Sequence, residues 1–281
     1  MPHAPARASR FIASTAVAII LALATAGCNT TRNGVAASSG LNAQASVPPP
    51  SAPGAPRSDA EWRQAVDIWG DRYRKDPADI QAAIAYARAL RATDQRAQAV
   101  AVLQQTSLRH PESMALLGAY GRALADAGQY KEALSVLAKA HTPDNPDWRI
   151  LNAQGAVLDE LGRHDEARKH YEAALKIVPG NAAVLSNLGL SYALTKDLKR
   201  AETSLRDASA KPDASPRVRQ NLALVIGLQG RFAEAERIAS ADLPPPEAEA
   251  NVRYLREMIA KQTAAKRPSR PLSLPNPDTG T

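Results

Sequence analysis

Few residues of this 281-residue chain have the types and spacing that acid–base or metal chemistry requires. The chain has five histidines, and only two of them lie near each other in the sequence: His3, His110, His141, His164 and His170. His164 and His170 are six positions apart, whereas two metal ligands on one helix face need a spacing of three or four. The pair therefore does not predict a zinc site.

Three carboxylates surround the same stretch of sequence, Asp159, Glu160 and Asp165. Acidic residues at a helix end more often solvate the surface than transfer protons. The chain also has neither a Gly-rich phosphate loop after a strand nor a G-x-S-x-G motif. We therefore expect no catalytic activity, no metal or other cofactor, and no small-molecule substrate.

Cys28 is the only cysteine, so the chain can form neither an internal disulfide nor a zinc site built from cysteines. The residues before it have the anatomy of an export signal: Arg7 and Arg10 are basic, Phe11 to Leu23 are almost all apolar, and positions 24–27 are small or polar. The apolar stretch is shorter than the roughly 20 residues that a membrane-spanning helix needs. We expect residues 1–27 to be a cleaved signal peptide.

The string LATAGC at residues 23–28 resembles the lipobox of bacterial lipoproteins, in which the cysteine sulfur is acylated and the chain is cut just before it. Thr25 stands where that family usually has leucine, and an ordinary secretory signal is the alternative. Asn29 follows the cysteine, where an aspartate would favour retention in the inner membrane. The resemblance implies a lipid on Cys28 and a place on the periplasmic face of the outer membrane.

The formal net charge is +7, with 35 basic and 28 acidic residues. Removal of Arg7 and Arg10 with the signal leaves about +5, which is mild, and an exported chain rarely meets nucleic acid. We therefore expect no nucleic-acid partner. Residues 28–57 contain VPPPSAPGAP and predict a disordered tether after the lipid, and residues 266–281 predict a second disordered tail.

Between these segments the sequence repeats with a period of 34 residues. One column of the repeat is always alanine: Ala65, Ala99, Ala133, Ala167, Ala201 and Ala235. A second column is small and a third, three residues later, is large and apolar: Ala87, Gly121, Gly155, Gly189 and Ala223, then Leu90, Leu124, Leu158, Tyr192 and Ile226. A fourth column predicts the turn between two helices: Asp94, Gly128, Gly162, Lys196 and Gly230.

This 34-residue pattern, with small residues at positions 8 and 20 and proline near position 32, resembles the tetratricopeptide repeat. The resemblance implies an all-α fold, a right-handed superhelix of helix pairs with capping helices. We expect five repeats at residues 80–113, 114–147, 148–181, 182–215 and 216–249. Capping helices are expected at 58–79 and 250–265, because the end repeats cannot bury their apolar faces alone.

In this family the first helix of each repeat lines a concave groove. We expect partner contacts from residues at the corresponding positions: Arg88, Arg91, Arg122, Arg149, Asn152, Ser186, Asn187, Leu190, Arg217, Gln220, Asn221 and Leu224. The first half of this set is rich in arginine and the second half offers leucines, so we expect a peptide with acidic residues at one end and apolar residues at the other. The alternative is that the arginines only keep the surface soluble.

The combined architecture resembles the TadD lipoproteins of the tight-adherence (Flp, type IVb) pilus system. The resemblance implies a non-enzymatic outer-membrane lipoprotein that binds protein partners and assists assembly of the pilus or of its secretin. Two alternatives stay open, a scaffold for exopolysaccharide or cell-envelope machinery and a factor in outer-membrane protein assembly.

Overall fold

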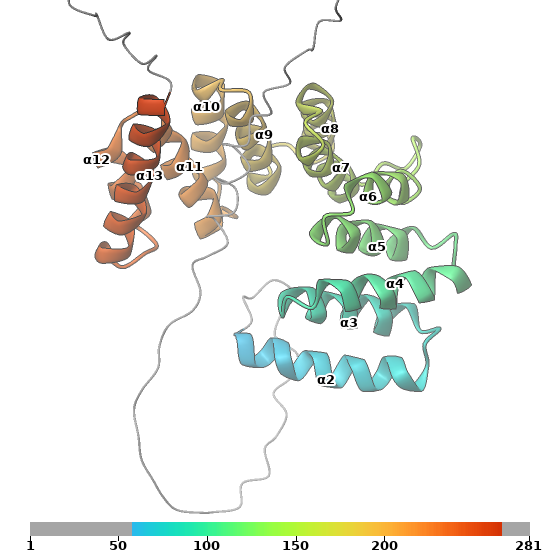
Figure 1. The fold of residues 1–281 in the computed structure, drawn as a ribbon. Coiled ribbons are helices and arrows are strands. Elements are labelled where there is room, and N and C mark those ends of the chain that lie inside the picture. The colour runs from blue at the N-terminus through green and yellow to red at the C-terminus, as the bar shows by residue number, and fades with distance from the viewer. Residues whose placement is uncertain (1–57, 266–281) are drawn as a thin grey trace, which may run out of the picture. The chain divides into compact units, whose positions relative to one another are not determined.

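The computed structural model describes residues 58–265, and all regular elements in that range are α-helices (Figure 1). They are α2 (Asp59–Lys75), α3 (Ile80–Ala92), α4 (Arg96–Arg109), α5 (Met114–Asp126), α6 (Tyr130–Leu137), α7 (Trp148–Glu160), α8 (His164–Ile177), α9 (Ala182–Leu194), α10 (Leu198–Ser209), α11 (Pro216–Leu228), α12 (Phe232–Ala239) and α13 (Pro245–Ala265). The expected signal peptide, Cys28, the tether and the tail lie outside the described residues.

The first helices of the five pairs, α3, α5, α7, α9 and α11, begin 34 residues apart and have 13 residues each. Each begins after a residue that favours a helix N-terminus: Asp79, Ser113, Asp147, Asn181 and Ser215. The first four accept a hydrogen bond from a backbone N–H of the first turn, and Ser215 is followed by Pro216, which has no such N–H.

The five turn residues of the repeat all have a left-handed backbone, with φ between 61° and 82°. At each turn the N–H of the following residue donates to the carbonyl of the large apolar residue near the helix end, as from Gln129 to Leu124 at 2.9 Å and from Arg163 to Leu158 at 2.8 Å. This bond closes the helix and reverses the chain. The sequence prediction of the inter-helix turns is confirmed.

The small residues let the two helices of a pair approach closely. A Cβ added to Gly155 would lie 2.5 Å from the ring of Tyr171, and one added to Gly121 would lie 2.5 Å from Cγ of Leu137. Facing them, the alanines of the always-alanine column, from Ala99 to Ala235, are fully buried. These contacts explain why both columns hold small residues.

The described chain forms two compact units, which meet in sequence at Pro179 and Gly180. In the first, α2 packs on α3, and the pairs α3–α4, α5–α6 and α7–α8 follow (Figure 1). In the second, the pairs α9–α10 and α11–α12 are followed by α13, which packs on α11 and α12 through Val252 and Leu255. No helix in residues 58–265 has both the length and the apolar character needed to cross a membrane.

Two second helices are shorter than the others. Helices α6 and α12 have eight residues each, whereas α4, α8 and α10 have 12 to 14. The chain after α6 contains Pro143 and Pro146 and runs as turns up to Asp147. At the other end, α13 begins at Pro245, inside the range predicted for the fifth repeat, and not at residue 250. Proline fits the first turn of a helix, so Pro245 and the proline after it start the last helix.

Candidate functional site

The first helices of each unit contact one another, α3 with α5 and α5 with α7 in the first unit, and α9 with α11 in the second. All twelve residues predicted to contact a partner lie on these helices. Five of them belong to the first unit and seven to the second, so the predicted groove is divided between two units, each of which is described by itself.

Three of the arginines in the first unit have partners within the chain. The Nε of Arg91 donates to Asp126 at 2.5 Å, which joins α3 to α5. The guanidinium of Arg88 lies over the ring of Trp62, 5.6 Å from its centroid, and that of Arg149 lies 4.5 Å from the centroid of Trp148. The sequence pattern alone does not pair these tryptophans with the arginines. The available signals are that Trp148 is next to Arg149 in the sequence and that Trp62 lies on the helix before the one with Arg88.

Arg122 differs from these arginines because no carboxylate or carbonyl in residues 58–265 pairs with its half-buried guanidinium. Burial lowers the pKa of Arg122, and the positive charges of Arg91 and Arg149 lower it further, against the opposing effects of Asp147 and Asp126. An arginine remains charged despite such a shift. Arg122 on α5 therefore lies near two further positive charges, Arg91 on α3 and Arg149 on α7.

Asp126 and Asp147, the two carboxylates whose charges act on Arg122, bond to other groups. Asp126 accepts the hydrogen bond from Arg91, and Asp147 accepts from the backbone N–H of Arg149 at 2.7 Å, where it caps α7. The guanidinium of Arg122 lies beside Gly118, where an added Cβ would be 3.5 Å from Nη1 of Arg122 and would clash with Ile150 Cδ1 at 2.6 Å. The surface is thus built to present a partly desolvated cation, which favours a carboxylate from outside the chain.

In the second unit, two predicted contact residues bond to each other. Asn221 and Ser186 are buried, with 6% and 3% of their surfaces exposed, and the amide of Asn221 donates to Ser186 Oγ at 3.0 Å. They join α9 to α11 inside the unit because α11 packs directly on α9. The structure thus gives these two residues a packing role inside the unit, and their contact with a peptide stays a prediction.

The other predicted residues stay accessible to different degrees. Arg217 is exposed, and the remaining ones are half-buried or close to it: Asn152, Asn187, Leu190, Gln220 and Leu224. Leu190 and Leu224 keep the apolar character that the sequence predicted for this part of the chain, and no contact in the structure tests their binding role.

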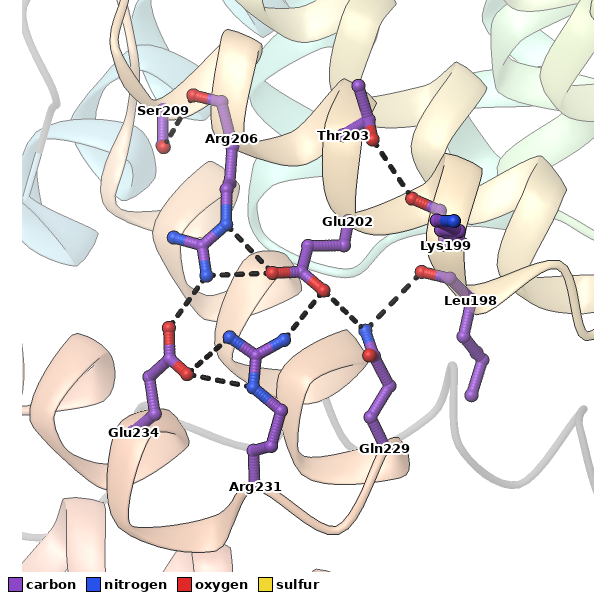
Figure 2. Close-up of polar contacts among 9 residues, drawn as sticks. All are labelled: Leu198, Lys199, Glu202, Thr203, Arg206, Ser209, Gln229, Arg231 and Glu234. Carbon is purple, nitrogen blue, oxygen red and sulfur yellow. Dashed lines mark hydrogen bonds and ion pairs between the residues drawn. The ribbon is translucent and has the colours of Figure 1, made fainter.

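Two arginines of this unit, Arg206 on α10 and Arg231 just before α12, are neutralised internally (Figure 2). Glu202 accepts from Arg206 at 2.8 Å, from Gln229 at 2.9 Å and from Arg231 at 2.7 Å. Glu234 accepts from Arg206 at 2.6 Å and from Arg231 at 2.9 Å. This network joins α10 to the turn between α11 and α12, and its arginines offer little unpaired charge to an anion.

The carboxylate and histidine group considered for catalysis is a packing network. Asp159 accepts a hydrogen bond from the hydroxyl of Tyr171 and lies 2.9 Å from Nδ1 of His164. Burial, with the adjacent Asp159, raises the pKa of Tyr171, so the phenol stays protonated. His170 lies apart from this network and lines a cavity with His141. In the part of the chain that the structure describes, no three metal-ligating side chains form a cluster.

Comparisons with known proteins agree with this architecture. Family models described as tetratricopeptide repeat match residues 79–147, 149–211 and 216–241, which together exceed half of the chain. No curated protein sequence matches the chain significantly.

Solved structures share the fold at low sequence identity. A tetratricopeptide-repeat protein of Thermus thermophilus is 18% identical, with 59% of this chain and 91% of that chain covered and a TM-score of 0.53. PilW, a type IV pilus biogenesis factor, is also 18% identical, with 69% and 86% covered and a TM-score of 0.54. With the repeat geometry and the family models, these likenesses identify the chain as a member of the tetratricopeptide-repeat proteins.

Proposed function

We propose that this chain binds an acidic segment of a protein partner at the surface around Arg122. Arg122 is half-buried, has no partner among the described residues, and lies close to Arg91 and Arg149. This arrangement supports the proposal most directly. Tetratricopeptide-repeat domains commonly serve as protein-interaction scaffolds. A carboxylate from a partner would pair with Arg122 without first displacing an internal ion pair.

We further propose that the protein is an outer-membrane lipoprotein, anchored through Cys28, that assists assembly of a Flp/Tad pilus or its secretin. The lipobox-like LATAGC and the proline-rich segment after it support the anchor. The likeness of the whole architecture to TadD lipoproteins supports the pilus role. PilW, whose structure has the same fold, is a pilus biogenesis factor, and this likeness concerns the fold alone.

The binding proposal is tested with pairs of ten-residue peptides that contain either two adjacent glutamates or two glutamines. We expect the glutamate peptides to bind more tightly, and Arg122→Gln to weaken them about tenfold or more, because a charge-assisted hydrogen bond contributes about 1.5–3 kcal/mol. Arg109→Gln is the matched control, since Arg109 is exposed on α4 of the same unit. Equal losses in both variants, or no preference for glutamate, would refute the proposal.

The cellular proposal is tested separately. The Cys28→Ser variant should leave the membrane fraction and fail to incorporate radiolabelled fatty acid. Capture with the lipidated protein from detergent-solubilised envelope, followed by mass spectrometry, should recover a secretin or another pilus component. Recovery of polysaccharide-export proteins in its place would favour the alternative scaffold role.

A further inference from the structure

A cavity of about 600 Å³ lies between the segment that follows α6 and the helices α7 and α8, all within the first unit. Most of its wall is apolar and comes from Ala138, Pro143, Pro146, Leu151, Ala173 and Ile177. The cavity is thus large enough to receive a side chain of any size. An apolar side chain would enter it favourably, because apolar surface leaves water.

Three buried polar atoms on residues that line this cavity have no hydrogen-bond partner in the described residues. They are Nδ1 of His141, Nδ1 of His170 and Oε1 of Gln154, and all three residues line the cavity. They are also the complete set of buried side-chain nitrogens and oxygens without a partner in the described residues. Each unpaired buried group costs about 1–3 kcal/mol, so three of them around one cavity favour a ligand whose binding lets these side chains form hydrogen bonds.

Buried polar groups elsewhere in the described chain are satisfied. Thr106, which is fully buried, donates to the carbonyl of Val102 at 3.0 Å, and Asn221 donates to Ser186. Gln154 is equally buried, with 4% of its surface exposed, yet its side-chain oxygen accepts nothing. The cavity is therefore exceptional within the described part of this protein.

The short helix α6 makes the cavity possible. It ends at Leu137 after eight residues, whereas the corresponding helix α4 has 14, so α6 is shorter by about 1.7 turns. The chain then crosses from Ala138 to Asp147 as turns, and the rings of Pro143 and Pro146 form one wall in place of a helix. The departure from the regular repeat thus coincides with the place where polar groups are left unpaired.

The lining groups define the chemistry of a ligand. Lys176 also lines the cavity and no carboxylate does, which disfavours a bound cation. Burial and the neighbouring His141 lower the pKa of His170, so this imidazole is neutral near pH 7, with one ring nitrogen able to accept and the other to donate. The amide oxygen of Gln154 needs a donor. The ligand should therefore combine an apolar body with an O–H or N–H group.

We propose that this cavity receives a tyrosine or tryptophan side chain of a protein partner, with its O–H or N–H directed to Gln154 or to a histidine. These two side chains join a large apolar surface to a single donor, and they frequently anchor protein interfaces. The inference rests on the proposal that the chain binds proteins, and it adds a contact apart from the Arg122 surface.

The test uses p-cresol and 3-methylindole, which reproduce the two side chains, and toluene, which lacks the donor. The mature chain with Cys28→Ser and ¹⁵N-labelled histidine is titrated with each probe by NMR. We expect p-cresol and 3-methylindole to shift the signals of His141 and His170, and toluene to bind at least about fivefold more weakly, as the loss of one hydrogen bond implies. Gln154→Met should weaken p-cresol about tenfold and leave toluene unchanged.

Gln104→Met is the matched control, because Gln104 is exposed on α4. Ala173→Leu, which fills the cavity, should abolish binding of all three probes, and circular dichroism checks that each variant is folded. Equal affinity for toluene and p-cresol, or no histidine shift, would overturn the inference. So would tight Zn²⁺ binding that displaces the probes. If only the cresol effects fail while Arg122→Gln still weakens acidic peptides, the protein-binding proposal survives without this pocket.

Discussion

Asn221 on α11 donates a 3.0 Å hydrogen bond from its side-chain amide to Ser186 Oγ on α9, and both residues are buried. The bond joins two successive helix pairs across 35 positions of sequence. Asn221→Ala should lower the free energy of unfolding by about 1–3 kcal/mol, because Ser186 loses its donor in a dry environment. Urea denaturation of the mature protein measures this.

Ser186→Ala and the double variant complete the cycle, and we expect the two single losses to be less than additive. Peptide affinity should stay unchanged in all three. A loss of affinity without a loss of stability would instead support the sequence-based prediction that these residues contact the partner.

Gly155→Ala should destabilise the first unit by about 1–3 kcal/mol, since the added methyl group would lie 2.5 Å from the ring of Tyr171 and helices α7 and α8 would have to separate. Thermal unfolding followed by circular dichroism is the measurement. Gly70→Ala, inside helix α2 of the same unit, is the control and should cost clearly less, because its added methyl group would lie 3.1 Å from the nearest atom, on the ring of Tyr86. Equal costs would show that close approach at Gly155 is not the cause.

Lys196→Gly should stabilise the protein by about 1 kcal/mol, which would raise the melting temperature, because a left-handed backbone costs a residue with a side chain about 1–2 kcal/mol relative to glycine. Lys196 has a φ of 65°. Gly162→Ala is the reverse control: its φ is 74° and a Cβ there meets nothing within 4 Å, so any loss comes from the backbone alone. A lower melting temperature for Lys196→Gly would contradict this account.

The network around Glu202 should make stability depend on pH in the acid range (Figure 2). Burial would raise the pKa of Glu202, but hydrogen bonds from Arg231, Gln229 and Arg206 outweigh it and lower the pKa from 4.5 to about 2. The stabilisation is therefore complete above about pH 4.5 and is lost as the pH falls towards 2.

Glu202→Gln should flatten that part of the curve of unfolding free energy against pH, measured from about pH 2 to about pH 6. It should also cost about 1–3 kcal/mol at neutral pH, because Arg206 and Arg231 lose a charged acceptor. Glu249→Gln, at an exposed pair with Arg253, is the control and should change the curve little. An unchanged acid slope in Glu202→Gln would assign the pH dependence to other carboxylates.

The repeat could be predicted from the sequence because its signals are local and recur. The left-handed residue at each turn and the capping residue before each first helix act within a few residues of the helix end that they form, and small residues recur at positions 8 and 20 of each repeat. The interrupted pair was harder to predict, because Ala133 and Leu137 keep the repeat pattern and only Pro143 and Pro146 hint that α6 ends early.

The candidate site was predicted in part. Placing Arg88, Arg91, Arg122 and Arg149 on the first helices required only the period, and the structure puts them on α3, α5 and α7. Whether each arginine has an ion-pair partner within the chain could not be predicted in this way. Arg206 and Arg231 share two glutamates, whereas Arg122 has none among the described residues, and this difference depends on side chains from different repeats.

The sequence by itself determined the all-helical repeat, its turns and the close contacts within each pair, because the period of 34 places equivalent residues in equivalent surroundings. Only the tertiary structure decided which polar groups are satisfied. It buried Ser186 with Asn221, left Arg122 without a carboxylate among the described residues, and gathered two histidines and a glutamine with unpaired polar atoms around one cavity. Whether such a group is paired depends on packing between helices, which the repeat pattern does not encode.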